Sequence, residues 1–484
     1  MGFYTINEKM FNQAFTENGD QAFKSTGSAC LDYFSLAGAM RFNLKHALTL
    51  FMKSYFENPL LTIKILFYIR DIRGGLGERC IFRSTFNALA NMYPEVALQL
   101  LKYIPEYGRY DDLLVCLTTP LKEEVIEFIR KQLAEDLENK KNNRPISLLA
   151  KWLPSINTSS DESRKFAIIL SKGLQMSKEE YRKMLSTLRK GIIIENNLRE
   201  KDYTFEYNTI PGGSMFKYKQ SFIRNDKIRY ENYLDEVNNG KTKMNTKNLY
   251  PYEIIRDLGK RQSKSALKSL DTMWKNFDRN EISSKTIVVR DGSGSMCDFN
   301  LVSAIDVATS LAILFAEQLT GEFKNKFITF SSKPKIVEIK GETIYEKYNF
   351  INSYCDYTNT NIEKVYTLIL NTYKHKEFKK EDALDRIVII SDMEFDCLED
   401  NSKSTFEYFK DEFSKLGFEI PELVFWNVRA RNIHFPALNE YNVKLVGGSS
   451  PKIIDEIIKN KGMTAYDYMI ECLNKYSCFD TIEF

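Results

Sequence analysis

The spacing of apolar residues changes once along this chain of 484 residues, and that change limits the folds open to it. Between about Phe34 and Arg199, apolar residues recur every three or four positions, which is the period of a helix that buries one face. After Glu281, short runs rich in Val and Ile alternate with helical segments, which is typical of a parallel sheet covered by helices on both faces. The sequence therefore predicts two architectures in one chain.

The first predicted architecture is an α-helical repeat array in residues 1–280, with an irregular basic segment at residues 200–280. Ser177 and Glu180 have the spacing of a capping box, and Asn58 followed by Pro59 combines a cap with proline in the first helical turn. Helices paired by short turns favour a solenoid-like array, although no repeat of fixed length is present. Helices are predicted over Asn58–Ile72, Pro94–Ile104, Leu121–Lys140, Ser160–Leu174 and Ser177–Ile192.

The second predicted architecture is a doubly wound α/β domain in residues 281–484, so that the fold class is α + α/β. Between its strands the sequence predicts helices, among them Leu301–Leu319, Asn361–Tyr373 and Phe406–Leu416. The strands are predicted over Lys285–Asp291, Asn325–Ser332, Arg386–Glu394, Pro421–Arg429 and Val443–Gly448.

Composition excludes several classes of protein. No stretch approaches 18 consecutive apolar residues, and the first residues lack the pattern of a secretory signal, so we expect a cytoplasmic protein with no membrane contact. Eight cysteines without a C-x-x-C pair and three scattered histidines argue against a disulfide framework and a zinc site. The net charge of +3 means that a nucleic-acid surface would have to arise from local segregation of basic residues.

Oxygen-bearing side chains gather where the predicted strands end. The loop Asp291–Met296 presents one carboxylate and two hydroxyls at positions i, i+2 and i+4, and ligands of such sheets collect at the carboxyl ends of the strands. A hard divalent cation such as Mg²⁺ takes about six oxygen ligands, so two further loops are needed to complete the site. The candidate metal ligands are Asp291, Ser293, Ser295, Thr358, Thr360 and Asp392.

The pattern D-x-S-x-S after a buried strand, with a later threonine and an aspartate after another buried strand, resembles the metal-ion-dependent adhesion site (MIDAS) of von Willebrand factor A (vWA) domains. The resemblance covers roughly Lys285–Val446. It implies that the first loop supplies three ligands, that Thr360 or Thr358 supplies a hydroxyl, and that Asp392 supplies a carboxylate, directly or through water. It further implies Mg²⁺, Mn²⁺ or Ca²⁺ as the cofactor and a protein partner that offers a carboxylate to the metal.

The helical half resembles a second kind of module. The segments Asn58–Leu61, Ile69–Arg79 (IRDIRGGLGER) and Tyr103–Leu114 (YIPEYGRYDDLL) resemble the HEAT-like TROVE module of Ro-type RNA-binding proteins, in which a ring of helices is closed by a C-terminal vWA domain. The same segments resemble still more closely a largely uncharacterised family of the same domain order, whose pattern also includes segments like Ser147–Ser155 and Lys217–Asp226, and this resemblance spans nearly the whole chain. The resemblance implies a Ro-like ribonucleoprotein that binds structured noncoding RNA or single-stranded RNA ends.

Basic residues beside glycines or aromatics are the candidates for RNA contact. The arginines around the Gly74–Gly77 turn suit phosphates, and basic residues interleaved with aromatics after Phe216 suit single-stranded RNA, where bases stack and phosphates pair. A solvated helical surface balanced by Glu is the competing interpretation. The candidate RNA-binding residues are Arg70, Arg73, Arg79, Arg164, Lys165, Lys172, Arg182, Lys183, Lys217, Lys219 and Arg224.

Three functions follow from these patterns. A non-enzymatic RNA-binding protein, whose vWA domain closes the ring or recruits a partner, is the leading hypothesis. A metal-dependent protein–protein adhesion scaffold without RNA is the alternative. A Mg²⁺-dependent phosphatase would use Asp291 as the nucleophile, but Ser293 stands where such enzymes carry a second aspartate, so we expect no enzymatic activity.

Overall fold

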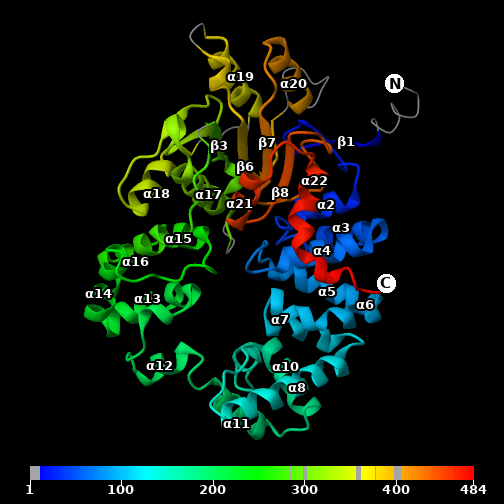
Figure 1. Cartoon of the computed structure of the whole chain (residues 1–484), viewed down its shortest axis with the longest axis vertical. Coiled ribbons are helices and arrows are strands. Elements are labelled where there is room, and N and C mark those ends of the chain that lie inside the picture. The colour runs from blue at the N-terminus through cyan, green and yellow to red at the C-terminus, as the bar shows by residue number, and fades with distance from the viewer. Residues whose placement is uncertain (1–10, 284, 298–301, 356–360, 376–377, 397–404) are drawn as a thin grey trace. The chain divides into compact units, whose positions relative to one another are not determined.

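The structure is a computed structural model of the whole chain, and it describes residues 11–283, 285–297, 302–355, 361–375, 378–396 and 405–484 (Figure 1). The chain forms two compact units. The first, here called the sheet unit, comprises Met1–Ile69, Gly74–Leu76 and Thr246–Ser477. The second, the helical unit, comprises Arg70–Arg73, Gly77–Asn245 and Cys478–Phe484. The predicted class, a helical array followed by an α/β domain, is confirmed, but these compact units divide the chain elsewhere than at residue 281.

A six-stranded sheet forms the core of the sheet unit, in the order β5-β4-β3-β6-β7-β8 (Figure 1). This order is the doubly wound arrangement 3-2-1-4-5-6. All pairings are parallel except that of β4 with β5, because only residues 331–335 separate these two strands and so short a link permits a hairpin but no crossover. The strands are β3 (Thr286–Asp291), β4 (Lys326–Phe330), β5 (Ile336–Glu338), β6 (Arg386–Ser391), β7 (Glu422–Asn427) and β8 (Val443–Gly447).

Helices cover the sheet. The central one, α17, is buried on nearly every side because Ala, Leu, Ile and Phe fill its sequence, and it packs on β3, β4 and β6. The helices after residue 245 are α15 (Pro251–Leu258), α16 (Lys264–Lys275), α17 (Ala304–Gln318), α18 (Ile344–Asn352), α19 (Ile362–Tyr373), α20 (Thr405–Lys415), α21 (Lys452–Lys459) and α22 (Ala465–Leu473).

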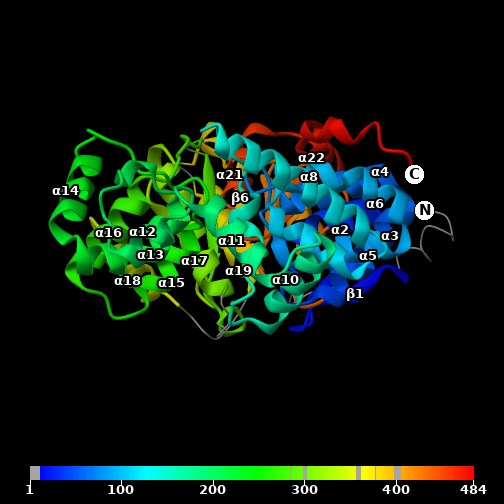
Figure 2. The ribbon, with the colours of Figure 1, turned by 90° about the horizontal axis from the view of Figure 1, so that it is seen from below.

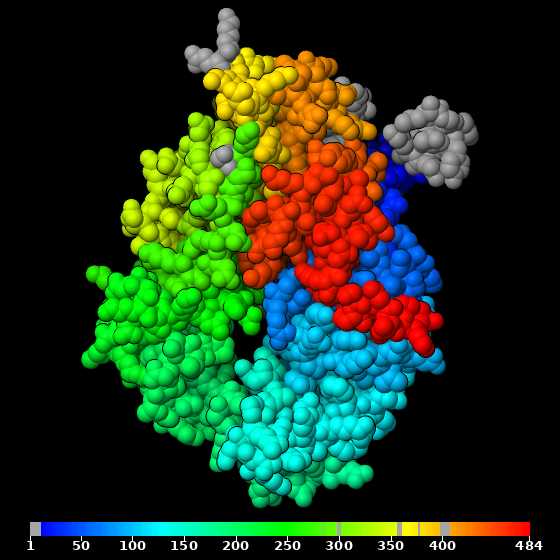
Figure 3. Space-filling model, viewed as in Figure 1, coloured from blue at the N-terminus to red at the C-terminus, as the bar shows by residue number. Residues whose placement is uncertain are grey.

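The N-terminal residues also belong to the sheet unit. Helix α2 contacts both β8 and α22. The Phe34 ring stacks on the Tyr68 ring with 5.1 Å between centroids, and it lies edge-on to the Tyr468 ring at 6.1 Å. In Figure 3 the red C-terminal helices accordingly lie against the blue N-terminal segment. A Cβ atom placed on Gly38 would lie 2.2 Å from the carbonyl oxygen of Gly447, so only glycine permits this approach of backbones. The N-terminal elements are β1 (Gln13–Phe15), β2 (Gln21–Phe23), α2 (Ala29–Ala37), α3 (Leu44–Glu57) and α4 (Pro59–Arg70).

The helical unit is built around α8, which contacts α9, α10, α11 and the 3₁₀ segment η2 (Figure 2). The capping box predicted for Ser177 and Glu180 is present at the start of α11. The helices of this unit are α5 (Arg79–Met92), α6 (Pro94–Leu100), α7 (Ile104–Tyr107), α8 (Lys122–Lys141), α9 (Leu149–Trp152), α10 (Asp161–Gly173), α11 (Lys178–Arg189), α12 (Ile194–Glu200), α13 (Gly212–Asn225) and α14 (Lys227–Asn238), with η1 (Leu101–Tyr103), η2 (Tyr110–Thr118) and η3 (Tyr207–Thr209) between them.

Residues 200–280 differ from the expectation of an irregular segment. They form α13, α14, α15 and α16. The aromatic residues Tyr207, Phe222, Tyr230 and Tyr233 make one buried cluster, which packs α13 against α14. A high tyrosine and lysine content had obscured the helical period. None of the helices in the described ranges is long and apolar enough to cross a membrane.

Candidate functional site

The sheet places two aspartates at neighbouring strand ends. Asp291 ends β3 and Asp392 directly follows β6, and these two strands pair in parallel at the centre of the sheet. The order of strands reverses between β3 and β6, which makes this the topological switch point, where doubly wound sheets bind their ligands. We call the polar residues gathered here the switch-point site.

Hydrogen bonds fix the first loop of the switch-point site. One carboxylate oxygen of Asp291 accepts from the backbone N–H of Ser293 at 2.8 Å, and the other accepts from the Ser391 hydroxyl at 2.6 Å. The hydroxyl oxygens of Ser293 and Ser295 lie 3.0 Å apart, and Ser295 also hydrogen-bonds Asp392. The loop therefore brings the three predicted ligands Asp291, Ser293 and Ser295 together with Asp392.

The two carboxylates are buried and close enough to oppose each other's charge. Asp291 is fully buried and Asp392 is 1% exposed. Burial, and then the charge of Asp392, raise the pKa of Asp291 to about 6. Burial also raises the pKa of Asp392, against the opposing effect of Arg431. A site that concentrates negative charge in this way gains stability when it binds a cation.

Residues outside the predicted set form the rim of the site. Arg431 donates to Asp392 at 3.1 Å and pairs with Glu17 at 2.7 Å. It therefore links the loop after β6 to the turn between β1 and β2. Glu394 accepts from the backbone N–H of Glu17 at 2.7 Å and from His434 Nε2 at 3.1 Å. No local pattern in the sequence predicts these contacts, because Glu17 lies more than 370 positions from its partners.

The donor set fits a hard divalent cation. Two carboxylates and two hydroxyls are the oxygen ligands that Mg²⁺, Mn²⁺ and Ca²⁺ prefer, and the mutual repulsion of the carboxylates favours such an ion. Within the described ranges, no group of three or more His, Cys, Asp or Glu residues is placed to hold a metal. The remaining predicted ligands, Thr358 and Thr360, lie outside the residues that the structure describes.

Two of the predicted RNA-binding residues are buried, and this corrects the prediction for them. Arg70 is 2% exposed and forms an ion pair with the fully buried Asp112 at 2.7 Å. Lys219 is 5% exposed and donates to the backbone oxygen of Phe216 at 3.1 Å, with its ammonium over the Phe216 ring. Neither side chain is available to a phosphate, because each is held in the interior.

The other predicted RNA-binding residues lie on the surface of the helical unit. Several of them are engaged at that surface: Arg73 donates to the backbone oxygen of Glu106, Arg164 pairs with Asp161, Lys183 pairs with Glu179 at 2.8 Å, and Lys217 approaches Glu195 at 3.8 Å. The rest are exposed and make no hydrogen bond or ion pair with another described residue, namely Arg79, Lys165, Lys172, Arg182 and Arg224.

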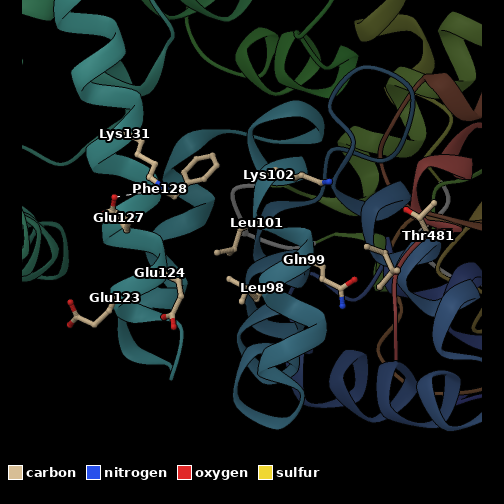
Figure 4. A pocket seen from close by; sticks show the side chains of 11 residues that line it. Leu98, Gln99, Leu101, Lys102, Glu123, Glu124, Glu127, Phe128, Lys131 and Thr481 are labelled. Atoms are coloured by element: carbon tan, nitrogen blue, oxygen red, sulfur yellow. Dashed lines mark ion pairs between the residues drawn. The ribbon is translucent and has the colours of Figure 1, made fainter.

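A separate groove of about 690 Å³ lies within the helical unit (Figure 4). Figure 4 shows Glu123, Glu124 and Glu127 on α8 along one side, and Leu98 and Leu101 on the other. Thr481 and Ile482, near the end of the chain, also line it. None of the residues predicted as functional lies in this groove.

The fold and the site together define a class of protein: a helical array joined to a doubly wound sheet with paired aspartates at its switch point. The chain belongs to the family described as "Domain of unknown function (DUF2828)", whose model matches residues 16–127 and 119–288. Residues 285–475 match a second model, "Domain of unknown function (DUF7788)".

Two individual proteins are similar over most of their length. "Uncharacterized protein L728" of Acanthamoeba polyphaga mimivirus is 27% identical over 518 aligned positions, covering 96% of this chain and 88% of that protein. Among solved structures, the "Crystal structure of Deinococcus radiodurans RO (RSR) protein" covers 91% of this chain and 93% of that chain, at 11% identity and a TM-score of 0.33. That structural likeness is too weak to support a function.

Proposed function

We propose that this protein is a non-enzymatic binding protein whose sheet unit holds a divalent cation and, through it, the carboxylate of a protein partner. One observation carries the proposal: Asp291, Ser293, Ser295 and Asp392 converge at the switch point of the sheet. A MIDAS-like role fits this arrangement, because the four side chains supply only part of an octahedral coordination sphere and leave positions for a partner.

Each side chain has a defined part in this proposal. Asp291 and Asp392 would hold Mg²⁺ together with the two serine hydroxyls, and Ser391 keeps the Asp291 carboxylate in place through its 2.6 Å hydrogen bond. When bound, the cation supplies a positive charge that accepts an oxygen ligand from the partner. Arg431 binds the same carboxylate of Asp392, so it balances that charge whenever no cation does.

Cation-linked stability tests this function. We expect Mg²⁺ or Mn²⁺ to raise the melting temperature of the wild type, since a ligand that binds only the folded state at 100 times its Kd adds about 2.7 kcal/mol. Asp291→Ala should abolish the rise. Asp385→Asn is the matched control, because Asp385 is exposed just before β6, at the opposite end of that strand. Equal melting of the wild type with Mg²⁺ and with EDTA would refute the proposed site.

RNA binding by the helical unit is the second function we propose, in the manner of Ro-type proteins and with single-stranded ends or structured noncoding RNA as the ligand. It is supported by the exposed basic residues on three of its helices: Lys165 and Lys172 on α10, Arg182 on α11 and Arg224 on α13. Affinity measured over a salt series tests it, because each phosphate contact with a single strand contributes about 0.7 to the slope of log affinity against log salt. Absence of salt-dependent binding would leave the cation-dependent module alone.

We expect no phosphatase activity. Asp291 has the buried position of a nucleophile, but the residue two places later, where an acid–base aspartate would act, is Ser293, whose hydroxyl contacts Ser295. A screen of phosphate esters with Mg²⁺ checks this expectation, and turnover lost in Asp291→Ala would overturn it.

A further inference from the structure

An arginine cluster lies on the helical unit, apart from the switch-point site. Arg79 and Arg83 stand four positions apart on α5 and therefore share one face of that helix. Arg83 contacts Asp111 at 2.8 Å and Asp112 at 2.7 Å. Arg109 donates two hydrogen bonds to Asp111, at 2.9 Å from Nε and at 2.6 Å from Nη2.

Positive charge exceeds negative charge in this cluster. Among the described residues, Arg70, Arg83 and Arg109 pair with two aspartates alone, Asp111 and Asp112. Arg79 is exposed and makes no ion pair with any other described residue. Its pKa is lowered, first by partial burial and then by repulsion from Arg109 and Arg83. An anion bound beside Arg79 would remove that repulsion.

Donor groups remain available for such an anion. Arg83 and Arg109 both use Nε and Nη2 on the aspartates, so the Nη1 group of each is left without a bond to another described residue. The aspartates meanwhile fix the orientation of both guanidinium groups. Arg83 and Arg109, oriented in this way beside Arg79, can each donate hydrogen bonds to the oxygens of one phosphate.

An aromatic side chain completes the surface. The Arg109 guanidinium lies 3.9 Å from the centroid of the Trp152 ring, and Lys151 lies 5.3 Å from it. Trp152 is half-buried, so part of its ring is open to solvent. Lys217, on α13 of the same unit, lies 4.6 Å from the ring of Tyr218.

We propose that Arg79, Arg83 and Arg109 bind a phosphate of single-stranded RNA while Trp152 stacks on an adjacent base. The inference rests on the RNA binding proposed above. Of the predicted phosphate-binding arginines Arg70, Arg73 and Arg79, it keeps Arg79 and adds Arg83, Arg109 and Trp152. A tryptophan beside the arginines favours RNA over a free phosphate, because a free phosphate has no base that could stack on the ring.

Tryptophan fluorescence of the full chain offers a local readout. The protein has three tryptophans, and the other two, Trp274 and Trp426, are 2% and 0% exposed within the sheet unit. Oligouridylate that stacks on Trp152 should therefore quench the emission of the one tryptophan that solvent reaches. Titration with oligouridylate over a salt series gives the affinity and its salt slope in the same experiment.

Three variants separate the contributions. Arg79→Ala should weaken oligouridylate binding about 10-fold, as expected for a charged hydrogen bond, and should reduce the salt slope by about 0.7. Trp152→Leu should lose about 10-fold in affinity through lost stacking, and Trp152→Phe should restore most of it, as followed by filter binding. Arg144→Ala is the control, because Arg144 is an exposed arginine of the same unit that lies outside the residues proposed to bind RNA.

The possible outcomes distinguish this inference from the proposed RNA binding on which it rests. If RNA binds with a steep salt slope but Arg79→Ala and Trp152→Leu behave like Arg144→Ala, this site is wrong and RNA binding stands. If the wild type binds no RNA, both fail. If inorganic phosphate alone quenches Trp152 as strongly as oligouridylate does, the cluster is a simple anion site and the inference is overturned.

Discussion

The buried pair of Arg70 and Asp112 allows one prediction to be worked out in detail. Arg70→Met removes the cation but keeps most of the side-chain volume. Breaking a buried ion pair costs about 3–5 kcal/mol, because the remaining charge stays buried without its partner. Asp112 keeps two donors, Arg83 Nε at 2.7 Å and the backbone N–H of Arg109 at 3.0 Å. We therefore expect the free energy of unfolding to fall by about 3 kcal/mol, near the lower end of that range. This is a large part of the usual free energy of unfolding of a domain, about 5–15 kcal/mol.

Hydrogen exchange of the helical unit measures this loss locally. A change of about 3 kcal/mol corresponds to a roughly 100-fold increase in the opening of α5 and η2. Gly108→Ala should have a similar effect by another route, since its Cβ would lie 2.6 Å from the Asp112 carboxylate and 3.0 Å from Arg70 Nε. Arg182→Met, at an exposed position, should stay within about 0.5 kcal/mol of the wild type. If Arg70→Met exchanges like Arg182→Met yet loses RNA affinity, Arg70 contacts the ligand and our reasoning from burial is wrong.

Three further predictions concern packing, pH and helix capping. Gly38→Ala should destabilise the sheet unit by about 1–3 kcal/mol, because the backbone oxygen of Gly447 cannot move away; an unchanged melting curve would contradict this. Burial lowers the pKa of Lys444 to about 8 from 10.5, so the unfolded chain binds more protons between these two values and the stability of the wild type should rise with pH there. Lys444→Met should lack this rise, which amounts to roughly 2 kcal/mol between pH 8 and pH 10 in urea unfolding. Ser177→Ala should cost about 1 kcal/mol and speed exchange in the first turn of α11, whereas unaltered exchange would mean that the cap does not stabilise the helix.

Local signals made most of the fold predictable. The run Lys285–Asp291 gave β3 to within one residue, and Leu121–Lys140 gave α8 equally well, because period and length identify such elements without their neighbours. The edge strand β5 has only three residues, and α18 follows it after a short link, so neither produced a clear period. The N-terminal hairpin of β1 and β2 was missed for the same reason.

The switch-point site was predictable where its residues adjoin strands and was not predictable elsewhere. Asp291 and Asp392 could be placed because parallel strands end at one edge of a sheet. Arg431 and Glu17 reach the site only through long-range packing, which spacing in the sequence does not express. Arg70 shows the opposite error: a basic residue next to glycines suggested a surface turn, although its partner Asp112 holds it in the interior.

The contact of α2 with β8 has a consequence for the newborn chain. Helix α2 ends at Ala37 and β8 begins at Val443, so about 400 residues of synthesis separate the two partners. At about 5–20 residues per second, a ribosome needs roughly 20 to 80 seconds to supply the missing strand. During that interval the face of α2 that carries Phe34 packs against α3 and Tyr68 of α4, but it lacks β8 and α22. Nascent chains stalled before Val443 should therefore expose this face to chaperones, and release should follow translation of β8.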